Sequence, residues 1–225
     1  MSPHDLDWKR IAAELAAQGF ATTGPLLTPA ECDAISSAYG DDAAFRSTVV
    51  MARHGYGRGE YRYYKYPLPQ RVQHLREAFY ARLAPIASAW GEAFAPRLEA
   101  QLARCHAAGQ TRPTPLLLRY GAGDYNCLHQ DLYGDLVFPL QVALLLNAPG
   151  VDFDGGEFVL VEQRPRQQSR AHVVSLRQGE GVIFAVREWL AQGARGTQRR
   201  PLRHGVSTVR SGQRHTLGLI FHDAA

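Results

Sequence analysis

The sequence has 225 residues, of which 45% are hydrophobic and 20% are charged, and its formal net charge is +4. These proportions are ordinary for a globular domain, and the lack of any run of about 18 apolar residues excludes a membrane-spanning helix. The mild positive charge permits contact with nucleic-acid phosphates but does not require it. Three scattered cysteines and an N-terminus without a basic or apolar leader predict a reducing compartment, with the cytoplasm as the expected location.

The N-terminal region is expected to combine helices with a short strand. Apolar residues recur at three- and four-residue spacing over residues 8–18, which predicts an amphipathic helix that ends at Gly19. Residues 20–23 follow as a short strand. Residues 28–31 read Thr-Pro-Ala-Glu, and this order predicts a helix start in which Thr28 is the N-cap and Glu31 completes a capping box.

Residues 51–66 mix aromatic and basic side chains in an unusual way, and glycines separate the first of them. Aromatic rings among cations can stack bases and contact phosphates, which favours a lid over a binding site. Under this interpretation, the substrate-binding residues are Arg58, Tyr61, Arg62 and Tyr63. A tyrosine-rich hairpin, with its rings packed on the core and its cations solvated, fits the segment equally well.

The apolar pattern changes near residue 110. Residues 69–104 hold a three-four repeat that predicts helix, and a polar linker covers 109–115. From Leu116 onward, short apolar runs are separated by Gly, Pro and Asp. The runs are 116–120, 138–146, 156–161, 172–176, 181–186, 202–209 and 216–221. Their length and spacing predict the short strands of a jelly roll.

The expected fold class is therefore mainly β with N-terminal helices, an α+β chain whose β part is a double-stranded β-helix. A single domain is expected over residues 1–225. Residues 1–110 would form a helical support and lid region, and residues 111–225 would form the jelly-roll core.

Two metal-competent side chains follow the first strand of this core. The apolar run passes through a Gly-x-Gly turn at 121–123 and ends in His129-Gln130-Asp131. Residues i and i+2 of an extended strand point to one face, so His129 and Asp131 can converge on one ion. A third ligand has to come from elsewhere, and His204 is the best candidate. Two histidines and one carboxylate form the facial triad of non-haem Fe(II) oxygenases, although hydrogen-bonded core histidines are the alternative.

A cation lies ten residues beyond His204. Arg214 opens a strand-like run that also contains Thr216. The guanidinium fork of an arginine at this place can hold a carboxylate through two hydrogen bonds.

This ordered set of residues resembles the 2-oxoglutarate- and Fe(II)-dependent dioxygenases, over roughly the second half of the chain from Leu116 to its end. The resemblance implies that His129, Asp131 and His204 hold Fe(II). It implies 2-oxoglutarate and O2 as co-substrates. By the same resemblance, the distal carboxylate of 2-oxoglutarate would be bound by Arg214, Thr216 and Tyr120.

Several features resemble different branches of this superfamily. Arg-Tyr-x-x-Gly followed by Leu-His-Gln-Asp is similar to the AlkB-like demethylases, although Leu118 stands where that pattern usually has Asn. The ten-residue offset of Arg214 and the Gly-Gly-Glu turn at 154–158 resemble prolyl-hydroxylase-like enzymes. The C-terminal half also resembles a bacterial group proposed to act on damaged nucleic acid. Its polar loop at 162–170 offers phosphate contacts or a solvated extension through Arg164, Arg166 and Arg170.

Three functions follow as hypotheses. The first is oxidative demethylation of alkylated nucleic-acid bases, a DNA-repair reaction. The second is prolyl-hydroxylase-like hydroxylation of a protein or amino acid. The third is a non-catalytic barrel that senses iron or 2-oxoglutarate, which the complete triad and Arg214 disfavour. The expected partners are 2-oxoglutarate and single-stranded or damaged nucleic acid, with no membrane, for a monomer or weak dimer.

Overall fold

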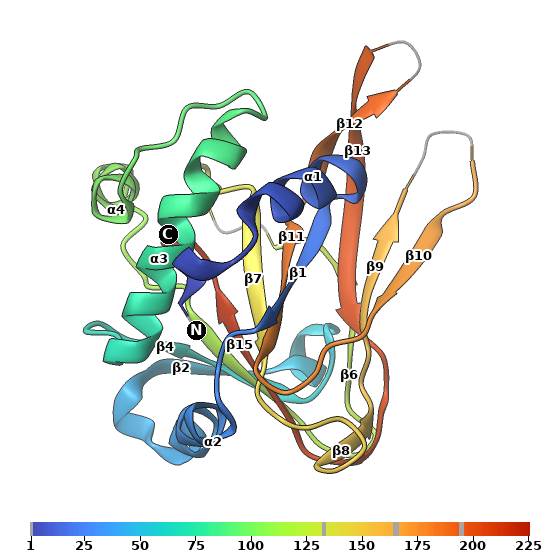
Figure 1. Cartoon of the computed structure of the whole chain (residues 1–225). Helices are drawn as coiled ribbons and strands as arrows, with labels where there is room; N and C mark the ends of the chain where they lie inside the picture. The colour runs from blue at the N-terminus through green and yellow to red at the C-terminus, as the bar shows by residue number, and fades with distance from the viewer. Residues whose placement is uncertain (1, 132–133, 164–166, 194–195) are drawn as a thin grey trace.

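A computed structural model describes residues 2–131, 134–163, 167–193 and 196–225 (Figure 1). Arg164 and Arg166, expected in a phosphate-binding or solvated loop, lie outside the described residues. The α-helices are α1 Trp8–Gln18, α2 Pro29–Ser37, α3 Gln70–Ser88 and α4 Leu98–Ala107. The 3-10 turns are η1 Pro3–Asp5, η2 Ala38–Gly40, η3 Asp42–Ala44 and η4 Met51–His54. Among the described residues, no helix combines the length and apolar character needed to cross a bilayer.

Two antiparallel sheets form the body of the molecule. The larger sheet consists, in spatial order, of β1 Phe20–Pro25, β11 Glu180–Ala185, β7 Leu140–Leu145, β15 Arg214–Leu219, β5 Leu116–Tyr120, β4 Glu60–Tyr64 and β2 Phe45–Val50. The smaller sheet consists of β10 Arg170–Val174, β9 Phe158–Glu162, β13 Gly196–Val206, β6 Tyr125–His129 and β3 Gly57–Arg58, with β12 Glu188–Gly193 paired to β13. A short ribbon joins β14 Val209–Gly212 to β8 Phe153–Gly155. The predicted mainly β fold with N-terminal helices is confirmed.

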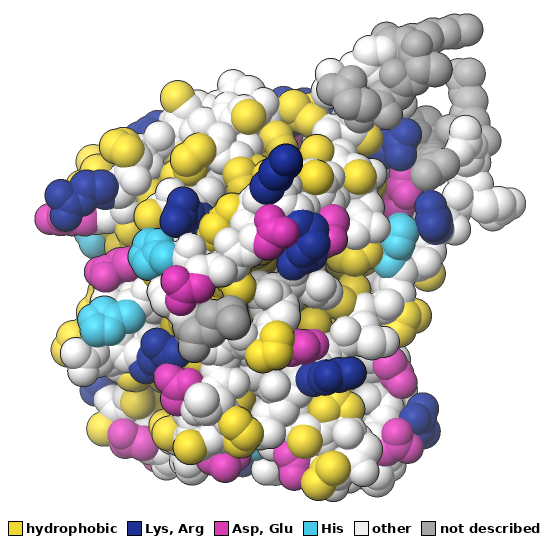
Figure 2. Space-filling model, viewed as in Figure 1, with side chains coloured by type: hydrophobic (Ala, Val, Ile, Leu, Met, Phe, Trp, Pro, Cys, Tyr) yellow, Lys and Arg dark blue, Asp and Glu magenta, His cyan; other side chains and the backbone are white. Residues whose placement is uncertain are grey.

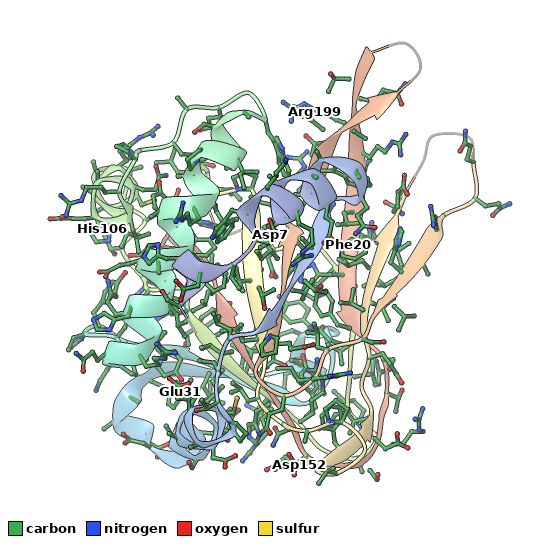
Figure 3. The ribbon with its side chains drawn as sticks, in the orientation of Figure 1. Asp7, Phe20, Glu31, His106, Asp152 and Arg199 are labelled. Carbon is green, nitrogen blue, oxygen red and sulfur yellow. The ribbon has the colours of Figure 1, made fainter. Side chains whose placement is uncertain are left out.

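The larger sheet is buried on both faces. Alternate residues of β7 show this, because Leu140, Val142 and Leu144 pack with the helices while Ala143 and Leu145 pack between the sheets. Helices α1 and α3 lie over the outer face, and side chains fill the space between the two sheets (Figures 1 and 3). Such burial fixes the strand register, since a shift of one residue would exchange the two faces.

The helix ends follow the residues that predicted them. Thr28 accepts from the backbone N–H of Glu31, and the Glu31 carboxylate accepts from the backbone N–H of Thr28 at 2.9 Å. Gly19 ends α1 at φ 80°, and a Cβ there would lie 2.7 Å from the Trp189 ring. Only glycine meets both demands at this position.

The first half of the chain contains more strand than the expected helical support and lid. Strands β2 and β4 extend the larger sheet, because residues 60–63 pair with β5. This pairing joins segments more than fifty residues apart, and a local hydrophobic pattern does not reveal it. The helical repeat over 69–104 is divided into α3 and α4 by residues 89–97.

Candidate active site

A cavity of about 260 Å³ lies between the two sheets. Its larger-sheet wall comes from β4, β5, β7, β11 and β15, and its smaller-sheet wall comes from β6, β9 and β13. The cavity reaches both sequence-predicted groups, the histidines with Asp131 and the Arg214–Thr216 pair. One space thus joins a candidate metal group to a buried cation.

The structure brings His129, Asp131 and His204 together. His129 and His204 are paired residues on β6 and β13. The Asp131 carboxylate lies 3.3 Å from Nε2 of His129 and 3.4 Å from Nε2 of His204. One ligand atom from each residue lies within 4.8 Å of the other two. Ligands held about 2.1 Å from a first-row metal stand about 3 Å apart when they are at right angles, and the distances of 3.3 Å and 3.4 Å to Asp131 are close to this spacing.

Backbone contacts orient the first of these ligands. Nδ1 of His129 lies 2.7 Å from the carbonyl oxygen of Cys127. When Nδ1 carries the proton and donates it to this oxygen, the lone pair of Nε2 is free to bind a metal ion. The ring of His204 packs beside the ring of Phe184 at 4.7 Å between centroids. Both imidazoles are therefore held in place by their surroundings.

The group has the charge that a divalent cation requires. Burial alone would raise the pKa of Asp131, but hydrogen bonds with His129 and His204 hold that pKa well below its usual range. Burial and the neighbouring His129 lower the pKa of His204. Burial opposes protonation of His129 too, but its hydrogen bond and ion pair with Asp131 raise its pKa. A carboxylate anion beside a neutral imidazole is a suitable donor set for Fe(II).

The other end of the cavity is built around Arg214. Its side chain is 3% exposed and donates from Nη1 to Oγ1 of Thr216 at 2.6 Å. Its Nε has no hydrogen-bond partner among the described residues, although the charge of Glu157 favours the cation. A buried unpaired guanidinium is costly, so an anionic ligand at this place would stabilise the protein. The distal carboxylate of 2-oxoglutarate fits this requirement.

Two neighbours shape the Arg214 pocket. Tyr120 is fully buried beside it, with its ring 5.6 Å from the guanidinium carbon, and burial raises the pKa of its phenol, so the hydroxyl stays a neutral donor. Gly156 adopts φ +62°, and a Cβ there would lie 2.9 Å from Cδ of Arg214. The Gly-Gly-Glu turn thus makes room for the cation.

The side chains of the tyrosine-rich segment, residues 51–66, point to different sides of the sheet. Tyr56 and Tyr61 line the cavity, and Arg58 lies nearby on β3 with a side chain that is 63% exposed. Arg62 points to the opposite face of β4, where it pairs with Asp42 and donates to the carbonyl oxygen of Tyr39. Tyr63 lies on the same face of β4 as Tyr61 and packs behind the cavity lining against Leu116 and Ile220. The cavity lining thus includes Tyr61 but not Arg62 or Tyr63, and the expected contact of these two residues with substrate stays a prediction.

Two polar cavity residues escaped the sequence analysis. Asn126 donates to the hydroxyl of Tyr120 at 3.4 Å, and Gln141 lies on β7. Gln141 could have been found, because it is the one polar residue in the apolar run 138–146 before Asn147. A lone amide in a strand buried on both faces is a signal for a polar site.

The comparisons with known proteins agree with this site. The family model "Oxygenase, catalysing oxidative methylation of damaged DNA" matches residues 59–224. The chain belongs to this oxygenase family. Two uncharacterized proteins of Mycobacterium tuberculosis strains are each 53% identical over 165 residues, which cover 71% of this oxygenase and 71% of the relative.

Solved structures share the fold of this oxygenase. A prolyl-4-hydroxylase of Pseudomonas putida matches with a TM-score of 0.52 at 15% identity, over 97% of this chain and 99% of that one. A 2-oxoglutarate-Fe(II) oxygenase family oxidoreductase of Burkholderia pseudomallei matches with a TM-score of 0.52 at 18% identity, over 98% and 94%. The family, the fold and the His-Asp-His group together make this protein a 2-oxoglutarate- and Fe(II)-dependent oxygenase, as its sequence predicted.

Proposed function

We propose that this oxygenase oxidises alkyl groups on nucleic-acid bases and thereby removes them. The observation that carries the proposal is the cavity mouth, where Tyr56 and Tyr61 lie in the same cavity as the His-Asp-His group. The family description names damaged DNA, and the net charge of +4 is compatible with a polyanionic substrate. The prolyl-hydroxylase neighbours support the fold and leave the substrate open, because their identities are only 14–16%.

The residues of the chain divide the work of such a reaction. His129, Asp131 and His204 would hold Fe(II), while Arg214, Thr216 and Tyr120 would bind the distal carboxylate of 2-oxoglutarate. When bound, the metal and co-substrate with O2 deliver one oxygen atom to a substrate C–H bond, as 2-oxoglutarate loses CO2 and becomes succinate. An N-methyl group becomes N-hydroxymethyl, which leaves as formaldehyde and returns an N–H to the base.

The aromatic residues account for how a base could reach this site. A base must leave its stack to enter a protein cavity, at a cost of a few kcal/mol. Stacking on an aromatic side chain recovers about 1–3 kcal/mol per base. Tyr56 is 50% exposed, and its ring stacks on that of His54 with a centroid distance of 5.3 Å. The exposed ring of Tyr56 and the inner ring of Tyr61 give a base two successive aromatic contacts.

A turnover screen tests the proposal. Purified protein with Fe(II), 2-oxoglutarate and O2 is given single-stranded oligonucleotides that each carry one N-methylated base, and separately a pool of peptides. We expect formaldehyde and succinate in equal amounts from at least one oligonucleotide. Substitution His204→Ala should abolish both products, because one of the metal ligands is lost, while the same change at exposed His74 leaves them unaltered. Gain of one oxygen on a peptide, without product from any oligonucleotide, would instead identify a hydroxylase.

A further inference from the structure

Gln141 is a polar side chain within an apolar part of the cavity wall. It lies on β7, which is buried along its whole length, and it is only 4% exposed. Along this strand, its neighbours on the inward face are Ala143 and Leu145. Across the sheet it pairs with Phe184, whose ring contacts the ring of His204. Gln141 is therefore close to the metal group and faces the same space.

The amide of Gln141 is not satisfied by the protein. Its Nε2 is buried and has no hydrogen-bond partner among the described residues. A buried donor left without an acceptor costs about 1–3 kcal/mol, and folded proteins avoid this cost where nothing requires it. Two other buried atoms of the cavity lining also lack a hydrogen-bond partner among the described residues, Nδ1 of His204 and Nε of Arg214, and Arg214 lies at the end that fits 2-oxoglutarate. Each end of the cavity thus presents an unpaired donor to a ligand.

The co-substrate is too short to serve both ends. Thr216 is paired with Leu145, and Gln141 lies four residues before Leu145 on the same strand. At about 3.3 Å per residue, the row of Gln141 lies about 13 Å from the row of Thr216. The five-carbon chain of 2-oxoglutarate, with bonds of about 1.5 Å, spans only about 5–6 Å. A molecule bound at Arg214 and Thr216 would therefore end near the intermediate row of Ala143 and Gly218.

We propose that Gln141 recognises the prime substrate, by donating a hydrogen bond from its amide nitrogen to an acceptor on the edge of the target base. The acceptor is a ring nitrogen or a keto oxygen of that base. This assignment rests on the proposed function, because the nature of the acceptor follows from a nucleobase substrate. It gives the cavity two polar ends, with Arg214 for the co-substrate and Gln141 for the base, on either side of an apolar middle.

The test uses the volume-conserving substitution Gln141→Met, which keeps the length of the side chain and removes its amide. The substrate is the oligonucleotide that the wild-type enzyme oxidises fastest. Loss of one neutral hydrogen bond should lower kcat/KM for this oligonucleotide about tenfold. The KM for 2-oxoglutarate should stay within about twofold of the wild-type value. More succinate should form per formaldehyde, because a poorly placed base allows co-substrate turnover without oxidation of the base.

Matched variants separate this role from the alternatives. Gln178→Met makes the same change outside the cavity, where the amide donates to the carbonyl oxygen of Leu146, and should alter neither ratio nor KM. Thr216→Val should raise the KM for 2-oxoglutarate and leave the ratio of succinate to formaldehyde near that of wild type. A Gln141→Met enzyme with unchanged oligonucleotide kinetics, or one that behaves like Thr216→Val, overturns the assignment. If no oligonucleotide is oxidised by the wild type, the proposed function fails first and the assignment fails with it.

Discussion

At the scale of single residues, the cavity is defined by charges and donors that the protein itself leaves unpaired. Arg214 is the strongest case, because its guanidinium is buried and, within the described part of the chain, donates to one side-chain acceptor, Thr216. Burial lowers the pKa of Arg214 from its usual range, yet an arginine starts so high that it remains a cation. Such a cation is most stable when an anion is bound beside it.

Substitution of Arg214 tests this directly. Arg214→Ala should raise the KM for 2-oxoglutarate by at least tenfold, because a charge-assisted bidentate contact is about twice as strong as a neutral hydrogen bond. Metal affinity, measured by titration calorimetry with Mn²⁺ in place of Fe(II), should change little. Arg210→Ala is the control, because Arg210 pairs with Asp154 at the surface and both side chains are more than half exposed. If the KM for 2-oxoglutarate rose only in the Arg210→Ala variant, the co-substrate would instead bind at the surface turn that carries Arg210.

His215 gives a second prediction at this scale, about pH. Its ring is 6% exposed, and burial together with the nearby Arg119 lowers its pKa to about 4. The unfolded chain binds a proton near pH 6.5 and the folded chain near pH 4, so this residue contributes full stability above pH 6.5. That contribution is lost as the pH falls from about 6.5 to about 4.

The expected loss of stability from His215 at pH 5 is up to about 2 kcal/mol. His215→Phe keeps an aromatic ring against Tyr39 and removes the titration. The difference in Tm between pH 7.5 and pH 5 should therefore shrink in this variant by several degrees. His74→Phe, at an exposed position of α3, should leave that difference as it is in the wild type. An equal pH dependence in wild type and His215→Phe would show that other groups cause the acid instability.

At the scale of elements, the sequence predicts what is local. Apolar runs at short spacing predicted β7, β11 and β15 to within a few residues, because two-sided burial leaves a mainly apolar sequence. The capping box likewise marked the start of α2. The site was accessible for the same reason, since His129 and Asp131 are two residues apart and only His204 had to be found across the chain.

Side-chain direction within β4 was not predicted. The side chains of residues 61–63 alternate between the two faces of the sheet, with Tyr61 and Tyr63 on one face and Arg62 on the other. Period-two alternation says that Arg62 and Tyr61 point apart, but it leaves open which face meets the cavity. The pairing of β4 with β5 decides this, and that contact is set by tertiary structure.

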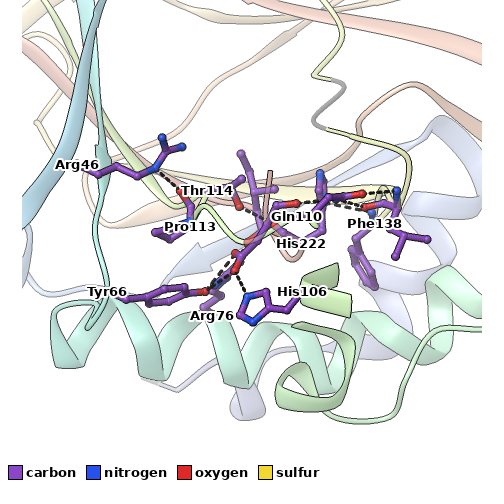
Figure 4. Close-up of polar contacts among 12 residues, drawn as sticks. Arg46, Tyr66, Arg76, His106, Gln110, Pro113, Thr114, Phe138 and His222 are labelled. Carbon is purple, nitrogen blue, oxygen red and sulfur yellow. Dashed lines mark hydrogen bonds and ion pairs between the residues drawn. The ribbon is translucent and has the colours of Figure 1, made fainter. Parts of the chain in front are cut away.

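The C-terminal segment is held by a buried polar network (Figure 4). Asp223 is fully buried and pairs with Nη2 of Arg76 on α3 at 2.9 Å, and it also accepts from the hydroxyl of Tyr66. Nε of Arg76 donates to the carbonyl oxygen of Ile220 at 2.7 Å, just after β15 ends. This network ties the long helix to the strand that carries Arg214.

Removal of one partner of this buried pair should be strongly destabilising. Arg76→Met leaves the Asp223 carboxylate buried without its cation, which costs about 3–5 kcal/mol. For a chain of this size the Tm should fall by at least about 6 °C, as measured by circular dichroism. Arg97→Met is the control, because Arg97 and Glu99 form an ion pair whose side chains are 81% and 86% exposed, and such pairs are worth about 0–1 kcal/mol. Equal Tm values for the two variants would show that the network contributes little.

At the scale of the whole molecule, the helices and the smaller sheet have different tasks. Helices α1 and α3 cover the outer face of the larger sheet and complete its core. On the face that they form, basic and acidic side chains are mixed, so it offers no large positive patch (Figure 2). Tyr56 is an exposed residue of the cavity lining, and it lies beside β3, where Arg58 is exposed as well. A polyanion should therefore be bound at the cavity mouth and not over the helices.

Salt dependence of binding to single-stranded DNA tests this placement. Each phosphate contacted contributes a slope of about −0.7 to the plot of log affinity against log salt. Arg58 has an exposed side chain, and the ion pair that it forms with Asp124 is long at 3.9 Å, so it is available to a phosphate beside the cavity. Arg58→Ala should weaken binding and flatten the slope by about 0.7, if one phosphate contact is lost.

Arg62→Ala is the control and should leave the slope unchanged, because its guanidinium is engaged by Asp42 and by the carbonyl oxygen of Tyr39 on the opposite face of β4. Fluorescence anisotropy with a labelled single strand at several salt concentrations gives both slopes. A slope that responds to Arg62 and not to Arg58 would place the nucleic acid on the helical side of the sheet and contradict entry beside β3.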